Sequence, residues 1–296
     1  MTAGARRLPV AAALALQGTL SSAAAQTTTP NLFLVRPQRS HVLVEMELSW
    51  SRPRAFIARN GDVERFSGPI GFGLGVLRVS WAPLAHVAVG VEAPYRAYRY
   101  RPDGFAEAAT GSGSPGIGIF ADWAPSREGA RLAVQARAGA FFASAAHGLP
   151  LSVSDGLNRY SLAAQLTTPA SGGLVAGLRV DFVVRLEYGP APRSEDNYVE
   201  AQVFLRAGPR LLRLGPADLH LLAVGGYRLA GAAREEANLL HDRNADNVVA
   251  GALLDVAWAG SSRGLRRSLL LGVTRQIGRS NALDGWRATL TLREGI

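Results

Sequence analysis

The chain has 296 residues, of which 48% are hydrophobic and 19% are charged, and it contains no cysteine. This composition is too apolar for a disordered chain, and it excludes disulfides and thiolate chemistry. The net charge of +9 comes from arginine alone, since the chain has no lysine. The arginines are scattered or paired rather than clustered, which does not favour nucleic acid as a partner.

The first 25 residues are predicted to be a signal peptide. Arg6 and Arg7 form a short basic segment, residues 8–20 are mostly apolar, and residues 23–25 are three alanines that suit a cleavage site. The apolar stretch is too short to cross about 30 Å of hydrocarbon as a helix. We therefore expect the chain to be exported rather than anchored by a helix.

After residue 40 the sequence alternates apolar with polar or small residues, the pattern of β-strands with two different faces. The clearest example is 174–188, where apolar side chains share one face while Arg179, Asp181 and Arg185 share the other. The pattern predicts twelve strands, at about 41–50, 69–81, 85–98, 114–124, 130–143, 158–167, 173–188, 197–212, 217–230, 247–259, 265–277 and 285–293.

The connections between these strands alternate in length. Long ones are expected at 51–68, 99–113, 144–157, 189–196, 231–246 and 278–284, and short ones at 82–84, 125–129, 168–172, 213–216 and 260–264. This asymmetry around an even number of antiparallel strands is typical of outer-membrane barrels. We predict an all-β protein in which residues 41–296 form a single antiparallel transmembrane β-barrel, with short periplasmic turns and longer extracellular loops. Residues 26–40 are expected either to lie in the periplasm or to plug the barrel.

Tryptophan placement favours the barrel over a soluble sandwich, in which some tryptophans would lie at mid-strand. All five fall near predicted strand ends, where an indole at the membrane interface keeps its polar N–H in contact with water. The predicted interface girdle consists of Trp50 and Trp286 at the external rim and of Trp81, Trp123 and Trp258 at the periplasmic rim.

The polar face of each predicted strand is assigned to the barrel interior, because an arginine facing lipid at the midplane costs roughly 2–4 kcal/mol. This assignment places His86, His220 and the glycines at 71, 73 and 75 inside as well. Two interpretations stay open: a polar pore that favours anionic or neutral solutes, and a lumen sealed by charges that pair across it. The residues predicted to line the lumen and set its selectivity are Arg131, Arg137, Arg179, Asp181, Arg185, Glu187, Glu200 and Arg228.

Three short segments resemble catalytic or ligand-binding motifs but lack an essential residue. Residues 111–116 match a glycine-rich phosphate loop, but a strand follows where a helix is needed. Residues 242–253 lack the glycine and glutamate of a calcium loop, which favours a solvated loop over a weak Ca²⁺ site. Residues 280–281 lack the neighbouring histidine of outer-membrane lipid hydrolases. We therefore predict no cofactor, no bound metal and no enzymatic activity.

Three other segments resemble a known group of outer-membrane proteins. They read VEAPY at 91–95, GSGSPGIG at 111–118 and LLGVTR at 270–275. With the predicted signal peptide, they make the sequence similar to the phenol-degradation-associated, transporter-like outer-membrane β-barrels. This resemblance implies a passive channel or uptake pore for small molecules, aromatic or anionic solutes among them, and no catalytic residues. An outer-membrane lipid-modifying hydrolase and a structural or adhesive barrel with a closed lumen are the alternatives.

Overall fold

The computed structural model describes residues 40–58, 60–66, 70–100, 109–114, 116–125, 131–141, 157–168, 173–187, 198–232, 245–258, 267–280 and 282–296. The predicted signal peptide and residues 26–39 lie outside these ranges. Within them, no helix is long and apolar enough to cross a membrane.

The described residues form fourteen strands, most of them 11 to 17 residues long. They are β1 (Val42–Ile57), β2 (Val63–Arg65), β3 (Ile70–Leu84), β4 (Val87–Tyr100), β5 (Ala109–Gly113), β6 (Gly116–Trp123), β7 (Arg131–Phe141), β8 (Leu157–Thr167), β9 (Leu174–Glu187), β10 (Tyr198–Leu214), β11 (Ala217–Ala232), β12 (Ala245–Trp258), β13 (Arg267–Ser280) and β14 (Ala282–Gly295).

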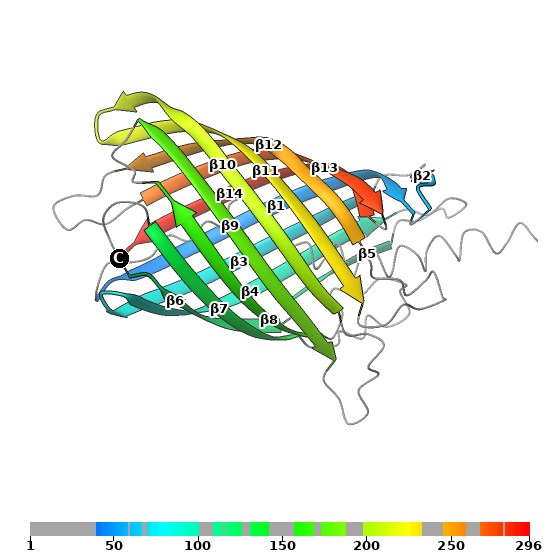
Figure 1. Cartoon of the computed structure of the whole chain (residues 1–296), viewed down its shortest axis with the longest axis horizontal. Coiled ribbons are helices and arrows are strands. Elements are labelled where there is room, and N and C mark those ends of the chain that lie inside the picture. The colour runs from blue at the N-terminus through cyan, green and yellow to red at the C-terminus, as the bar shows by residue number, and fades with distance from the viewer. Residues whose placement is uncertain are drawn as a thin grey trace, which may run out of the picture.

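These strands form one closed antiparallel barrel with a wall of twelve strands (Figure 1). β5 and β6 pair with successive halves of β4 and together make one wall strand, while β2 pairs only with the end of β1. β14 pairs with β1 from Leu43↔Gly295 to Ile57↔Ala282, so the sheet has no free edge along this seam. The prediction of a single antiparallel barrel of about twelve strands is confirmed.

The two ends of the barrel differ in how the strands are joined. At one end, which we call the turn end, β3–β4 and β10–β11 are joined by two residues each. Gly215 begins the second of these turns with φ of 57°, a left-handed conformation that glycine favours. The start of β1 and the last residue also lie at the turn end, where the Val42 N–H donates to the Ile296 carbonyl at 2.9 Å. We call the opposite end the loop end.

Three predicted connections are shorter than expected, the first being 99–113, where β4 continues to Tyr100 and β5 covers Ala109–Gly113. β1 continues to Ile57, through much of the segment 51–68 that was expected to be a loop. A β-bulge between Pro53 and Ala55 explains this, because a bulge interrupts the hydrogen-bond ladder where proline has no N–H to donate. β13 and β14 likewise extend to Ser280 and Ala282, so most of the expected loop 278–284 is strand.

Successive residues of each strand face opposite sides of the wall, and the register keeps each kind of residue on one side. In one row, Glu45, Arg78 and Glu92 are cross-strand partners, and they face inward. In the next row toward the loop end, Met46 and Leu77 are partners and are exposed on the outer face. The barrel is therefore apolar outside and charged inside.

Two of the inner-face placements were wrong. The alternation runs unbroken from Arg78 along β3, so the glycines at 71, 73 and 75 face outward instead. Gly71 and Gly73 lie beneath the Trp50 indole, whose ring atoms a Cβ at Gly71 would overlap. His86 lies in the β3–β4 turn and is exposed, with Nδ1 at 3.2 Å from the Ala124 carbonyl oxygen.

Candidate functional site in the barrel lumen

Eleven arginines and eight carboxylates face the lumen among the residues whose side chains are described. Period-two alternation brings them there from eleven of the wall strands, because charged residues recur on one face of each strand. The arginines are Arg78, Arg96, Arg137, Arg159, Arg179, Arg206, Arg210, Arg213, Arg228, Arg287 and Arg293, and the carboxylates are Glu45, Glu47, Glu92, Asp122, Asp181, Glu200, Asp218 and Asp255.

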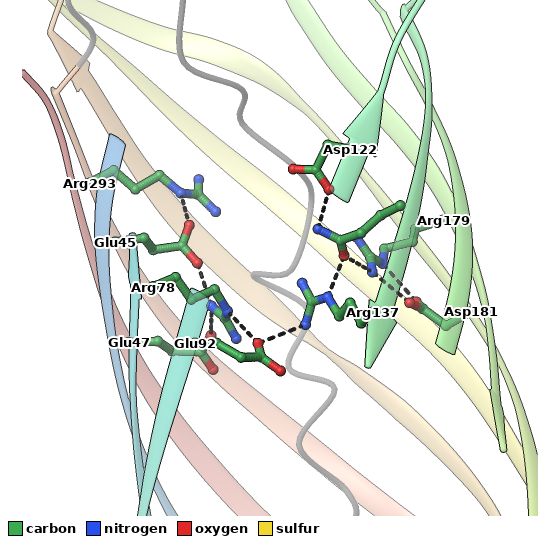
Figure 2. A network of polar contacts seen from close by, with 10 residues as sticks. Glu45, Glu47, Arg78, Glu92, Asp122, Arg137, Arg179, Asp181 and Arg293 are labelled. Atoms are coloured by element: carbon green, nitrogen blue, oxygen red, sulfur yellow. Dashed lines mark hydrogen bonds and ion pairs between the residues drawn. The ribbon is translucent and has the colours of Figure 1, made fainter. Parts of the chain in front are cut away.

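Arg78 on β3 is the centre of a network that crosses four neighbouring strands (Figure 2). It forms ion pairs with Glu45, with Glu47 at 3.2 Å and with Glu92 at 3.3 Å. The other oxygen of Glu45 accepts a hydrogen bond from Arg293 on β14 at 2.5 Å. Three acids and two guanidinium groups therefore compensate one another in a buried cluster, which offsets part of the cost of removing them from water.

Glu92 extends the network across β6 to Arg137 on β7, with Nη1 and Oε2 at 3.2 Å. The intervening residue on the inner face of β6 is Gly118, the cross-strand partner of both Glu92 and Gly139. A Cβ at Gly118 would lie 2.8 Å from Glu92 Cγ and 2.9 Å from its Oε1. The missing side chain of Gly118 therefore gives Glu92 room to reach Arg137.

Gln135 joins this cluster to a second group of charges on β6 and β9. Its carbonyl oxygen accepts hydrogen bonds from Arg137 Nε at 2.6 Å and from Arg179 Nη2 at 3.2 Å, and its amide donates to Asp122 at 2.6 Å. Arg179 also donates two hydrogen bonds to Asp181, at 2.7 and 2.6 Å. The connected network thus extends from β14 through β1 to β9, as Figure 2 shows.

A separate pair lies on β10 and β11, where Arg228 Nε donates to Glu200 Oε2 at 3.0 Å. The Gln202 amide donates to the same carboxylate oxygen at 2.9 Å. The two terminal nitrogens of Arg228 and both ring nitrogens of His220 have no hydrogen-bond partner in the described part of the chain. This wall of the lumen therefore holds buried donors that no described residue satisfies.

The structure brings some of the predicted lumen residues together. Arg137, Arg179 and Asp181 belong to the connected network, while Glu200 and Arg228 form the pair on the β10–β11 wall. The remaining three predicted residues belong to β7 and β9, but their side chains lie outside the described part of the structure; they are Arg131, Arg185 and Glu187. A role of these eight residues in selectivity stays a prediction.

Arg96 and Gln135 are lumen residues that were not singled out from the sequence. Arg96 lies four residues after Glu92 on β4, so parity alone would have placed it inside with Glu92. Gln135 carries no charge and its role depends on partners from three different strands. No signal within β7 itself identifies it as the link between the two charge clusters.

All five tryptophans lie on the outer face of the wall, as their registers show. Trp81, Trp123 and Trp258 lie within four residues of the strand ends at the turn end, and Trp50 and Trp286 lie toward the loop end. Four of them expose between 43% and 51% of their surface, and Trp258 is partly buried. This arrangement suits indoles at the two interfaces of a membrane.

The motifs rejected from sequence contribute no site among the described residues. Gly111, Gly113 and Gly116 lie on β5 and β6. Asp242 and Asn244 of the calcium-like segment fall outside the described residues, and no cluster of metal-ligating side chains occurs within them.

The comparisons with known proteins agree with the barrel fold. No known protein family and no curated protein sequence matches the chain. Among solved structures, it is similar to an outer membrane channel from Pseudomonas putida F1, at 11% identity and a TM-score of 0.60, covering 91% of this chain and 100% of that one. It is also similar to the β domain of the Bordetella autotransporter BrkA, at 12% identity and a TM-score of 0.53, covering 86% and 99%. At these identities the likeness concerns the fold alone.

The position of Gly118 gives a first prediction. We expect Gly118→Ala to displace Glu92 and to lower the free energy of unfolding by about 1.5–3 kcal/mol, because hydrogen bonds to charged groups are lost. Gly225→Ala is the control, since a Cβ there meets no atom within 4 Å. Urea unfolding of the detergent-refolded proteins measures both, and equal stability of the two variants would contradict the role assigned to Gly118.

Proposed function

We propose that this protein is an outer-membrane β-barrel that acts as a passive channel for small solutes, with anionic solutes favoured. The observation that carries the proposal is the charged inner face of a closed barrel whose outer face is apolar. The resemblance noted from sequence adds aromatic compounds as candidate solutes. The predicted signal peptide supports export to the outer membrane.

The outer face supports a membrane location. Large apolar side chains are exposed all around the wall, and examples are Leu48 on β1, Ile119 on β6, Leu162 on β8, Phe182 on β9 and Leu205 on β10, with 45% to 62% of their surface accessible. A soluble protein rarely exposes so continuous an apolar surface. Hydrocarbon chains would cover this surface at no cost, and a closed barrel satisfies its backbone hydrogen bonds internally.

The inner face supports passage of polar solutes. Its described side chains carry eleven positive and eight negative charges, an excess of three positive charges that favours anions electrostatically. The terminal nitrogens of Arg228 are buried donors with no hydrogen-bond partner among the described residues, so the β10–β11 wall also carries positive charge that is only partly compensated.

A closed structural barrel is the competing proposal, and the connected network from β14 to β9 is the observation in its favour. Reconstitution into planar lipid bilayers separates the two proposals. Discrete conductance steps support the channel, whereas insertion without conductance would support the closed barrel.

The membrane location predicts a depth-dependent cost of charge on the outer face. Val180 lies at the middle of β9 with its side chain exposed, and Leu174 begins the same strand at the turn end. We expect Val180→Arg to lower the free energy of unfolding in lipid by roughly 2–4 kcal/mol and Leu174→Arg by about 0–1 kcal/mol. Equal values for the two variants in phosphatidylcholine vesicles would argue against insertion.

The charge balance of the lumen predicts the ion selectivity. Arg287→Glu changes the described inner charges from eleven positive and eight negative to ten positive and nine negative, and Arg287→Gln removes one positive charge. We expect the reversal potential in a KCl gradient to move toward cation selectivity, more for glutamate than for glutamine. Arg279→Glu makes the same change at an exposed position beside Asp246 on the outer face and serves as the control. Unchanged reversal potentials in both Arg287 variants would contradict the selectivity assignment.

A further inference from the structure

A row of three residues crosses β1, β14 and β13 on the outer face near the loop end. Trp286 is the cross-strand partner of Arg52 on one side and of Arg275 on the other. The Arg275 guanidinium carbon lies 5.5 Å from the Trp286 ring centroid, a cation–π distance. An indole is thus flanked by two arginines on a surface that otherwise faces hydrocarbon.

The rows beneath this one are apolar. The next row toward the middle of the wall is Trp50, Ala288 and Val273, and the row after it is Leu48, Leu290 and Leu271. We call these six residues the apolar column. A charged row above an apolar column on the same three strands matches the order of headgroup and acyl chains in a lipid.

The arginines of this region carry more charge than their acidic neighbours neutralise. Arg275 donates to Asp284 at 2.5 Å, and Arg279 Nε lies 3.9 Å from Asp246 Oδ2. Arg52 and Arg54 are exposed, and neither forms an ion pair with any described residue. Four arginines therefore face two acids on β1, β12, β13 and β14.

The outer face at the turn end shows the contrasting arrangement. Arg267 on β13 is paired with Glu294 on β14 at 2.6 Å. This outer arginine therefore has an acidic partner within the wall, whereas Arg52 at the loop end has none among the described residues.

We propose that Arg52 and Arg275, with the apolar column beneath them, bind a phosphorylated lipid of the outer leaflet. The guanidinium forks donate hydrogen bonds to headgroup phosphate, for which their planar geometry is suited, and the acyl chains lie along the column. Trp50 and Trp286 mark the depth at which headgroup and chains meet. This inference rests on the proposed outer-membrane location, with the loop end outward.

The test uses the refolded protein in phosphatidylcholine nanodiscs doped with either bisphosphorylated or dephosphorylated lipid A, and native mass spectrometry measures the bound lipid. We expect the wild type to retain the phosphorylated form and the double variant Arg52→Gln with Arg275→Gln to lose roughly tenfold in affinity, since charge-assisted hydrogen bonds are removed. The single variant Arg52→Gln breaks no ion pair in the described structure, and we expect it to fold and to lose affinity as well.

The matched control for Arg52→Gln is Arg267→Gln, which removes one positive charge from the outer face at the turn end and is expected to retain the lipid. Equal retention by all variants, or equal retention of the dephosphorylated lipid, would overturn the inference. Displacement of the lipid by inorganic phosphate alone would also overturn it, because the column would then contribute nothing. Failure of the protein to insert into nanodiscs would instead contradict the proposed function, so the two failures are distinguishable.

Discussion

The pairing of β14 with β1 is the constraint on which the rest of the structure depends. Once the sheet closes, its wall strands have no free edge at this seam, and the backbone polar groups are satisfied within the wall. Each strand then has one face toward the outside and one toward the axis. Both the exposed apolar side chains and the clustered charges follow from this division, because a sequence with period two separates them strand by strand.

Closure also brings together charges that are distant in sequence. Arg293 and Glu45 come from the last and first strands, yet they share a hydrogen bond of 2.5 Å across the seam. Burying such charges singly would cost several kcal/mol each, so their arrangement as a continuous network is what makes a charged interior compatible with folding. The seam is thus held by side chains as well as by the backbone ladder.

The sequence was sufficient for the barrel because alternation and connection length are local signals. It misplaced elements where a local rule was interrupted: the first strand was expected to end at residue 50, but a bulge after Pro53 allows β1 to continue to Ile57. The charged residues of the lumen could be assigned by parity, which would also have given Arg96. The partners of these residues could not be assigned by parity, because a partner depends on the register between strands. It is this register that places Gly118 between Glu92 and Arg137.

The use of arginine as the only long basic residue has a structural consequence. A guanidinium group has five N–H donors in a planar fork, so Arg78 can contact carboxylates from β1 and β4 at once, which the point charge of a lysine would do with less geometric definition. The same planar fork suits phosphate on the outer face, where Arg52 forms no ion pair with an acidic side chain in the described structure. One residue type can therefore serve both surfaces, and the difference lies in whether the neighbouring strands supply a carboxylate.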